Sequence, residues 1–140
     1  MSLLGVLNIA GSGMGAESQR LSAVASNIAN ANTSVGPGGE PYRAREVVFQ
    51  AVPGAGGNGD DASSAGMAGV KVAAIVESDA PLKQVYDPGS TFADQNGYVK
   101  MPNVNNVDEM VNMLSAQQDY QADLEAFNVA KTLALRTLQI

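Results

Sequence analysis

The stretch LLGVLNIAGSGMGAESQRLSAVASNIANA, residues 3–31, repeats every seven residues. One line of the repeat is apolar throughout, and a second line, offset by four residues, has Glu17 as its only polar member. The first line consists of Leu7, Met14, Leu21 and Ile28, and the second of Leu3, Ala10, Glu17, Val24 and Ala31. These lines are the a and d positions of a heptad, so the sequence predicts a helix with a seam for a supercoiled partner.

Small residues interrupt this helix, with glycine at Gly5, Gly11, Gly13 and Gly15. Each glycine destabilises a helix interior by roughly 0.5–1 kcal/mol relative to alanine, so we expect the helix to form fully only against a partner. The run Gly11–Gly15 is not a phosphate-binding loop, because no strand precedes it and no Gly-Lys-Ser/Thr follows. Its small residues instead predict a close approach of two helix backbones.

Residues 107–140 contain no Gly and no Pro and predict a second helix of about 30 residues, about 45 Å long. Asn105 or Asn106 can cap its start, and Asp108 suits the positive end of the helix dipole. Apolar residues in this segment follow a spacing of three and four, with Gln117 and Lys131 as polar interruptions. The apolar residues of this spacing are Met110, Met113, Tyr120, Leu124, Phe127, Ala134 and Leu138. The sequence therefore predicts two long helices with similar seams at opposite ends of the chain.

The two terminal helices are expected to pair in an antiparallel or staggered manner, within one subunit or between subunits. Leu7, Met14, Leu21 and Ile28 would then face Met113, Tyr120, Leu124 and Phe127. Further apolar residues widen the stripe on the second helix, namely Val107, Val111, Leu114, Val129 and Leu135. One 31-residue partner helix cannot cover so wide a stripe, so we expect additional partners.

The middle of the chain predicts strands and loops. Residues 42–52 and 69–76 have strand composition and would form a hairpin, with a Gly-rich flexible tip at 53–66. Residues 98–102 form a short extended run before the last helix. The predicted class is α+β, with residues 1–34 and 105–140 as a helical, coiled-coil-like domain. Residues 35–104 would form a small β and loop domain.

Absent residue types exclude most catalytic chemistry in this 140-residue chain. With no Cys and no His, it lacks the commonest nucleophile, general base and metal ligands, so we expect no enzyme, metal or cofactor. The net charge of −6 argues against nucleic-acid binding. Asp60 and Asp61 lie on the Gly-rich tip, where nothing would hold a catalytic pair. Asp119, Asp123 and Glu125 are expected on a solvated helix face.

One segment is more specific than these patterns: Ala25-Ser-Asn-Ile-Ala-Asn-Ala-Asn-Thr33. It resembles the N-terminal signature of bacterial flagellar axial proteins, and residues 39–50, 69–72, 97–104, 109–112 and 133–138 are similar to rod proteins of the flagellar basal body. Asn27 and Asn30 lie beside the seam, where a buried Asn can fix the register between helices.

This resemblance implies a structural subunit of the proximal rod, with both terminal helices in an inner tube. It implies self-association, contacts with other rod proteins and rod-base components, no small-molecule substrate, and export by the flagellar type III apparatus. The first basic residue is Arg20, so we expect no cleaved signal peptide. Two alternatives remain open, an exported coiled-coil adhesion or effector protein outside the rod, and a small carboxylate enzyme.

The predicted assembly interface follows the two helices. It comprises Leu3, Leu7, Met14, Leu21, Val24, Asn27, Ile28, Asn30, Met110, Met113, Leu114, Tyr120, Leu124, Phe127, Leu135 and Leu138.

Overall fold

A computed structural model describes residues 3–34, 39–53 and 67–138 of the chain. These residues form two helices and four strands. The side chains of residues 67, 68 and 138 lie outside this description, and so does the predicted hairpin tip beyond Pro53, including Asp60 and Asp61.

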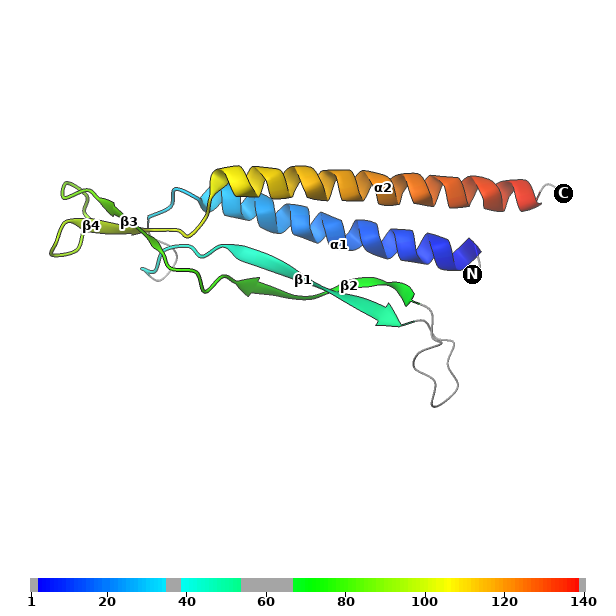
Figure 1. The fold of residues 1–140 in the computed structure, drawn as a ribbon, viewed down its shortest axis with the longest axis horizontal. Coiled ribbons are helices and arrows are strands. Elements are labelled where there is room, and N and C mark those ends of the chain that lie inside the picture. Colours follow the sequence, from blue (N-terminus) through cyan, green and yellow to red (C-terminus); the bar gives the residue numbers. More distant parts are fainter. Residues whose placement is uncertain (1–2, 35–38, 54–66, 139–140) are drawn as a thin grey trace.

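Two long antiparallel helices dominate the fold (Figure 1). Helix α1 spans Leu3–Asn30 and helix α2 spans Asn106–Leu138, with 28 and 33 residues. The predicted cap of α2 is confirmed: Oδ1 of Asn105 accepts the Val107 N–H at 3.2 Å, and its Nδ2 donates to Asp108 at 2.7 Å. The α+β class and the pair of long terminal helices are therefore as the sequence predicts.

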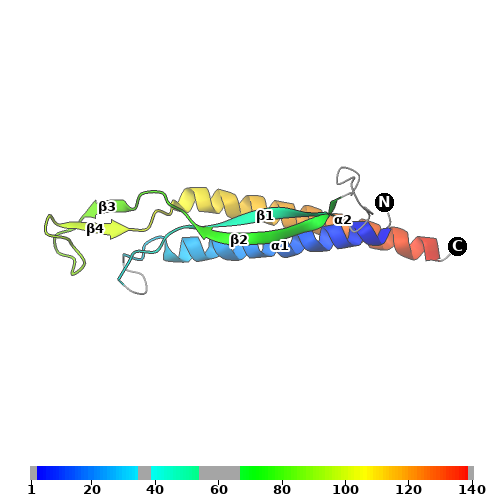
Figure 2. The same cartoon turned by 90° about the horizontal axis from the view of Figure 1, so that it is seen from below.

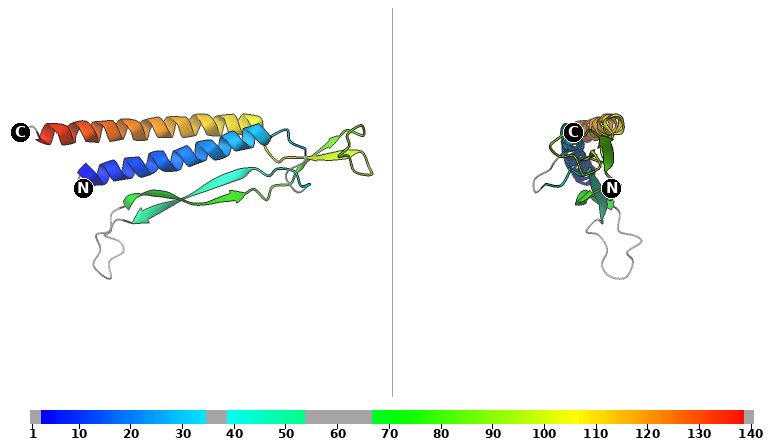
Figure 3. Two further views of the ribbon diagram at one scale, coloured as in Figure 1. Left: turned by 180° about the vertical axis from the view of Figure 1, so that it is seen from behind. Right: turned by 90° about the vertical axis from the view of Figure 1, so that its left-hand side faces the viewer.

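The predicted hairpin lies along α1, on the side away from α2 (Figures 1 and 2). Strands β1 (Arg45–Pro53) and β2 (Met67–Glu77) pair in antiparallel fashion, with Arg45 opposite Glu77 and a register shift between Val48 and Phe49. Both strands contact α1, which makes α1 the middle of three layers. Figure 3 shows the same order from behind.

A second small sheet extends past the helix ends (Figure 2). Strand β4 (Tyr98–Met101) is the predicted extended run, and it pairs with β3 (Lys83–Tyr86), which the sequence did not predict. Tyr86 and Tyr98 stack edge to face across the pair at 5.3 Å. Gly97 has φ +83°, and a Cβ there would lie 2.9 Å from the Tyr86 ring, so the turn before β4 requires glycine.

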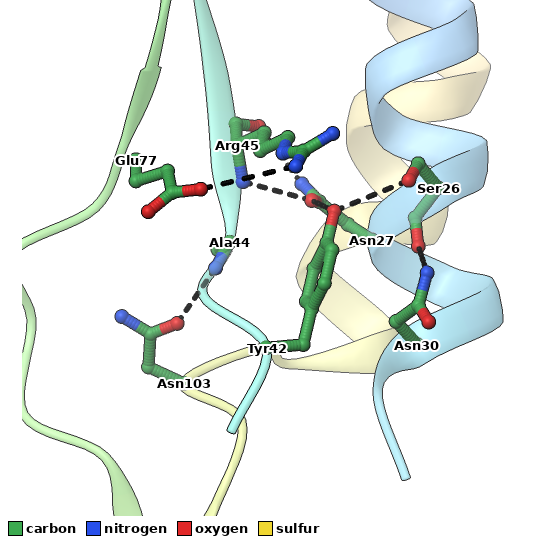
Figure 4. A network of polar contacts seen from close by, with 8 residues as sticks. All are labelled: Ser26, Asn27, Asn30, Tyr42, Ala44, Arg45, Glu77 and Asn103. Atoms are coloured by element: carbon green, nitrogen blue, oxygen red, sulfur yellow. Dashed lines mark hydrogen bonds and ion pairs between the residues drawn. The ribbon is translucent and has the colours of Figure 1, made fainter. Parts of the chain in front are cut away.

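The buried amide of Asn27 joins all three layers, and Figure 4 shows its contacts with Tyr42 and with the start of β1. Asn27 is 1% exposed. Oδ1 accepts the Arg45 N–H at 2.8 Å and the Tyr42 hydroxyl at 2.9 Å, while Nδ2 donates to the Arg45 carbonyl at 2.9 Å and to Glu109 at 3.2 Å. One side chain of α1 thus binds the start of β1 and the first turn of α2, using both donors and both lone pairs.

Ser12 holds the other end of the hairpin against α1. Its hydroxyl donates to the Ile9 carbonyl at 2.7 Å and accepts the Val70 N–H at 3.0 Å. Ser12 and Asn27 are fifteen residues apart, about 22 Å along the helix. The hairpin is therefore bound to α1 near both of its ends through its own backbone.

Replacing Asn27 by Ala should destabilise the chain by about 2–3 kcal/mol, because it leaves buried backbone groups of Arg45 and the Glu109 carboxylate without their partner. Chemical denaturation of the purified protein, followed by circular dichroism, measures the loss. The matched control is Asn30→Ala, since among the described residues the Asn30 amide bonds only to the Ser26 carbonyl of its own helix, at 2.8 Å. Equal destabilisation by the two variants would contradict the assignment.

Candidate assembly interface

The inner face of α2 follows a heptad with two lines of residues. Every position of these lines is buried or half-buried, and among the described helices and strands α1 alone packs on α2. One line is Met113, Tyr120, Phe127 and Ala134, and the other is Glu109, Ala116, Asp123 and Ala130. The first line is one of the two lines in the predicted apolar spacing, whereas Met110 and Leu124 of the other predicted line are exposed. The second observed line was not predicted, because small and acidic residues occupy it.

The inner face of α1 is built mainly from small residues. Its buried positions are Ala10, Gly13, Ala16, Glu17, Ala23, Val24 and Asn27. A Cβ at Gly13 would lie 2.8 Å from Cγ of Asp123 on α2. At this glycine the backbone of α1 meets the side chain of Asp123, so the contact is between backbone and side chain and does not test the predicted close approach of two helix backbones. The predicted seam residues Leu3, Leu7, Met14, Leu21 and Ile28 are half-buried, so each keeps some surface beyond the helix pair.

Three carboxylates and one arginine meet between the helices. Nη1 of Arg20 lies 3.4 Å from Glu17 and 3.4 Å from Asp119. Burial raises the pKa of Glu17, and the Asp119 and Asp123 charges add to this shift against the opposing effect of Arg20. Burial, followed by the charge of Asp119, also raises the pKa of Asp123. The expected solvated position of Asp123 is wrong, because its carboxylate packs on Gly13.

The outer face of α2 is apolar and uncovered. Large side chains on it are between 41% and 67% exposed: Val107, Met110, Val111, Leu114, Leu124, Val129, Leu133 and Leu135. The expectation that one partner helix leaves part of the stripe uncovered is therefore confirmed. An open apolar groove of about 510 Å³ continues this face between Leu3 and Val6 of α1 and Ala126, Val129 and Leu133 of α2.

The predicted interface residues thus fall into two groups. Val24, Asn27, Met113, Tyr120 and Phe127 are at least half-buried within the subunit, whereas Met110, Leu114, Leu124 and Leu135 are exposed. Asn30 is half-buried at the end of α1, and the Leu138 side chain lies outside the described residues. The contact of these residues with neighbouring subunits stays a prediction.

The described residues show no built chemical site of another kind. Among them, no three Asp, Glu, His or Cys side chains are grouped so that they could hold a metal ion. Neither of the two described helices has an apolar stretch sufficient to cross a membrane.

Replacing Asp123 by Asn should stabilise the chain at pH 7, by less than about 1 kcal/mol, because it removes a partly buried charge from an acidic cluster. The unfolded chain loses this proton near its usual pKa of 3.8, and the folded chain loses it only at a higher pH. The folded state holds more protons in between, so stability falls as pH rises through that interval.

Thermal unfolding at pH 4, 5, 6 and 7 measures this effect, and the variant should lose less stability toward neutral pH than the unmodified chain. The control Asp79→Asn removes the same charge from an exposed position between β2 and β3. An unchanged pH profile in the Asp123 variant would contradict the placement of that carboxylate.

Both helices match known families, at the two ends of the chain. The family described as flagella basal body rod protein matches residues 7–36, and the C-terminal family of the flagellar basal body rod FlgEFG proteins matches residues 95–140. The flagellar basal-body rod protein FlgC of Salmonella typhimurium is 51% identical over 140 residues, which cover 100% of this chain and 98% of that protein. FlgC of Yersinia enterocolitica is 47% identical and FlgC of Borreliella burgdorferi 35% identical, each with the same coverage. The chain belongs to the FlgC family of flagellar basal-body rod proteins.

Proposed function

We propose that this chain is a structural subunit of the flagellar rod, in its proximal part, and that it binds its neighbours through the outer faces of its terminal helices. The observation that carries the proposal is the row of large apolar side chains on α2, which the subunit leaves uncovered. A monomeric protein rarely exposes so many large apolar side chains on one helix. Membership of a rod-protein family supplies the class of partner.

The layered fold supports different roles for the helical part and the β-rich part of the subunit. Residues 1–34 and 105–140 would form the helical part of the tube wall, and residues 35–104 would form a β-rich part on one side of it. The β1–β2 hairpin packs on α1 and the β3–β4 sheet extends past the helix ends, so both leave the outer face of α2 free (Figures 1 and 2). The side of α2 opposite α1 is therefore the side available to neighbouring helices.

The partners and location follow from the same proposal. Other rod proteins, rod-base components and further copies of this chain would contact the exposed helix faces. The subunit would reach the periplasm-spanning rod through the flagellar type III export apparatus, without cleavage of a signal peptide. Its role would be mechanical rather than catalytic, in keeping with the absence of His and Cys from the sequence.

Electron microscopy of basal bodies from cells that lack this chain tests the proposal. The rod should be missing while the membrane ring remains. Intact rods would contradict the proposal and would favour an exported coiled-coil protein that acts outside the basal body.

Replacing Leu114 by Asp should abolish incorporation into rods, because the carboxylate would be buried without a partner in the contact between subunits. Leu114 is 56% exposed in the subunit, so the stability of the isolated chain should change by no more than about 0.5 kcal/mol. Immunoblots of purified basal bodies measure the incorporation, and thermal unfolding of the purified variant measures the stability.

The matched control is Gln118→Asp, which adds the same charge one helical turn further along α2, at a position that is already polar and exposed. This control should be incorporated as the unmodified chain is. Normal motility and normal rod content in the Leu114 variant would show that this face is not in contact with a neighbour.

A further inference from the structure

The β3–β4 sheet and the turn between its strands, residues 83–101, form an arm that is held together by its own contacts. Tyr86 packs edge to face on Tyr98 across the two strands. The Asp94 carboxylate accepts the backbone N–H groups of Asn96 and Tyr98, each at 2.9 Å, and so closes the turn. Neither strand packs on another helix or strand of the described chain. The arm is therefore a separate unit that extends past the helix ends (Figure 2).

The apolar cluster at the adjoining helix ends does not extend into the arm. It contains no residue of β3 or β4, and consists of Ala31, Ala44 and Val104 with Tyr42 packed against it. An open hollow of about 350 Å³ lies between the arm and the loop that precedes β1. Its lining includes Pro41 on the side of the loop, and Phe92 and Tyr98 on the side of the arm. This cluster therefore does not set the direction of the arm.

The arm is attached through two linkers, one from β2 to β3 and one from β4 to α2. The side chain of Asn103, in the second linker, bonds across to the first. Its Nδ2 donates to the carbonyls of Ser78 at 3.2 Å and Ala80 at 3.0 Å, and its Oδ1 accepts the Ala44 N–H at 2.8 Å. Figure 4 shows the last of these bonds. One half-buried amide thus joins both linkers to the residue before β1.

Two cations add bonds at the same junction. Nη1 of Arg43 donates to the Ser78 carbonyl at 3.1 Å, and Nζ of Lys83 donates to the Val104 carbonyl. Neither cation forms an ion pair among the described residues, so both charges are directed at backbone carbonyls. The Ser78 N–H also donates to the Ala44 carbonyl at 2.7 Å, which binds Ser78 to the hairpin. Any turning of the arm would therefore occur beyond Ser78.

We infer that Asn103 fixes the direction in which the arm extends from the helix pair. Without its amide, the arm would turn as a unit on its two linkers, while the helix pair and the β1–β2 hairpin keep their contacts with α1. The inference does not depend on the proposed function, because the junction lies within one subunit. In the proposed rod, the same residue would determine where the arm meets a neighbouring subunit.

Distances between spin labels test the inference in the isolated full-length chain, which has no cysteine of its own. Labels at Gln84→Cys in β3 and Gln118→Cys in α2, both exposed positions, report the direction of the arm. Labels at the exposed Lys71→Cys in β2 and at Gln118→Cys form a reference pair that does not include the arm. Double electron–electron resonance should give a narrow distance distribution for both pairs. With Asn103→Ala, the width for the arm pair should at least double, and the reference pair should not change.

The matched control is Asn96→Ala, in the exposed turn of the arm. Among the described residues the Asn96 side chain forms no hydrogen bond, so this variant should leave both distributions unchanged. If circular dichroism shows that Asn103→Ala does not fold, Asn103→Asp keeps the test decisive. The aspartate retains an oxygen for the Ala44 N–H and loses the donor to Ser78 and Ala80, so it should also broaden the distribution of the arm pair.

Three results would overturn the inference. A narrow and unshifted distribution for the arm pair in the Asn103 variants would show that other contacts hold the arm. Equal broadening of the reference pair would show that Asn103 stabilises the whole subunit rather than the direction of the arm. A broad distribution for the arm pair in the chain with Asn103 intact, beside a narrow one for the reference pair, would show that the arm has no fixed direction.

Discussion

The structure depends on one buried amide, that of Asn27. It occupies a position where the two helices and the hairpin meet, and its four hydrogen bonds exhaust what the side chain can form. Two of these bonds go to the backbone N–H and carbonyl of Arg45. They would therefore position the hairpin whichever side chain stood at residue 45. A slide of α1 along either neighbour would leave buried polar groups without partners, so this residue fixes the register of all three layers.

The sequence predicts the helices well because their heptads are long and because Asn105 caps the start of α2. It predicts half of the α2 seam, since Met113, Tyr120 and Phe127 form an apolar line. The line through Glu109, Ala116, Asp123 and Ala130 has the same period but no hydrophobic signal. This line faces α1 because α1 provides a partner for each of its two acidic residues. The Asn27 amide bonds to Glu109, and the bare backbone of Gly13 leaves room for Asp123.

Strand β3 shows a different limit of sequence reasoning. All four of its residues are exposed, so no alternation of buried and solvated positions marks it, and only its pairing with β4 makes it a strand. Asn27 shows a third limit. A buried Asn beside a seam indicates that register is being fixed, but the partner proves to be a strand as well as a helix. The missed contacts of Asn27 and of the second α2 line are made between segments far apart in the chain, whereas β3 and β4 are separated only by residues 87–97.

In an ordinary core the large apolar side chains are buried, whereas in this helix pair the small ones are buried and many large ones are exposed. Ala10, Ala16, Ala116 and Ala130 are buried, while Val107, Val111 and Leu135 remain more than half exposed. Unfolding of a lone subunit therefore exposes little new apolar area, and its heat-capacity change and denaturant sensitivity are small for a chain of this length. In the proposed assembly, most of the hydrophobic free energy would be released only when neighbours dock. We therefore expect a solitary subunit to melt gradually over a broad temperature range and the finished assembly to melt sharply.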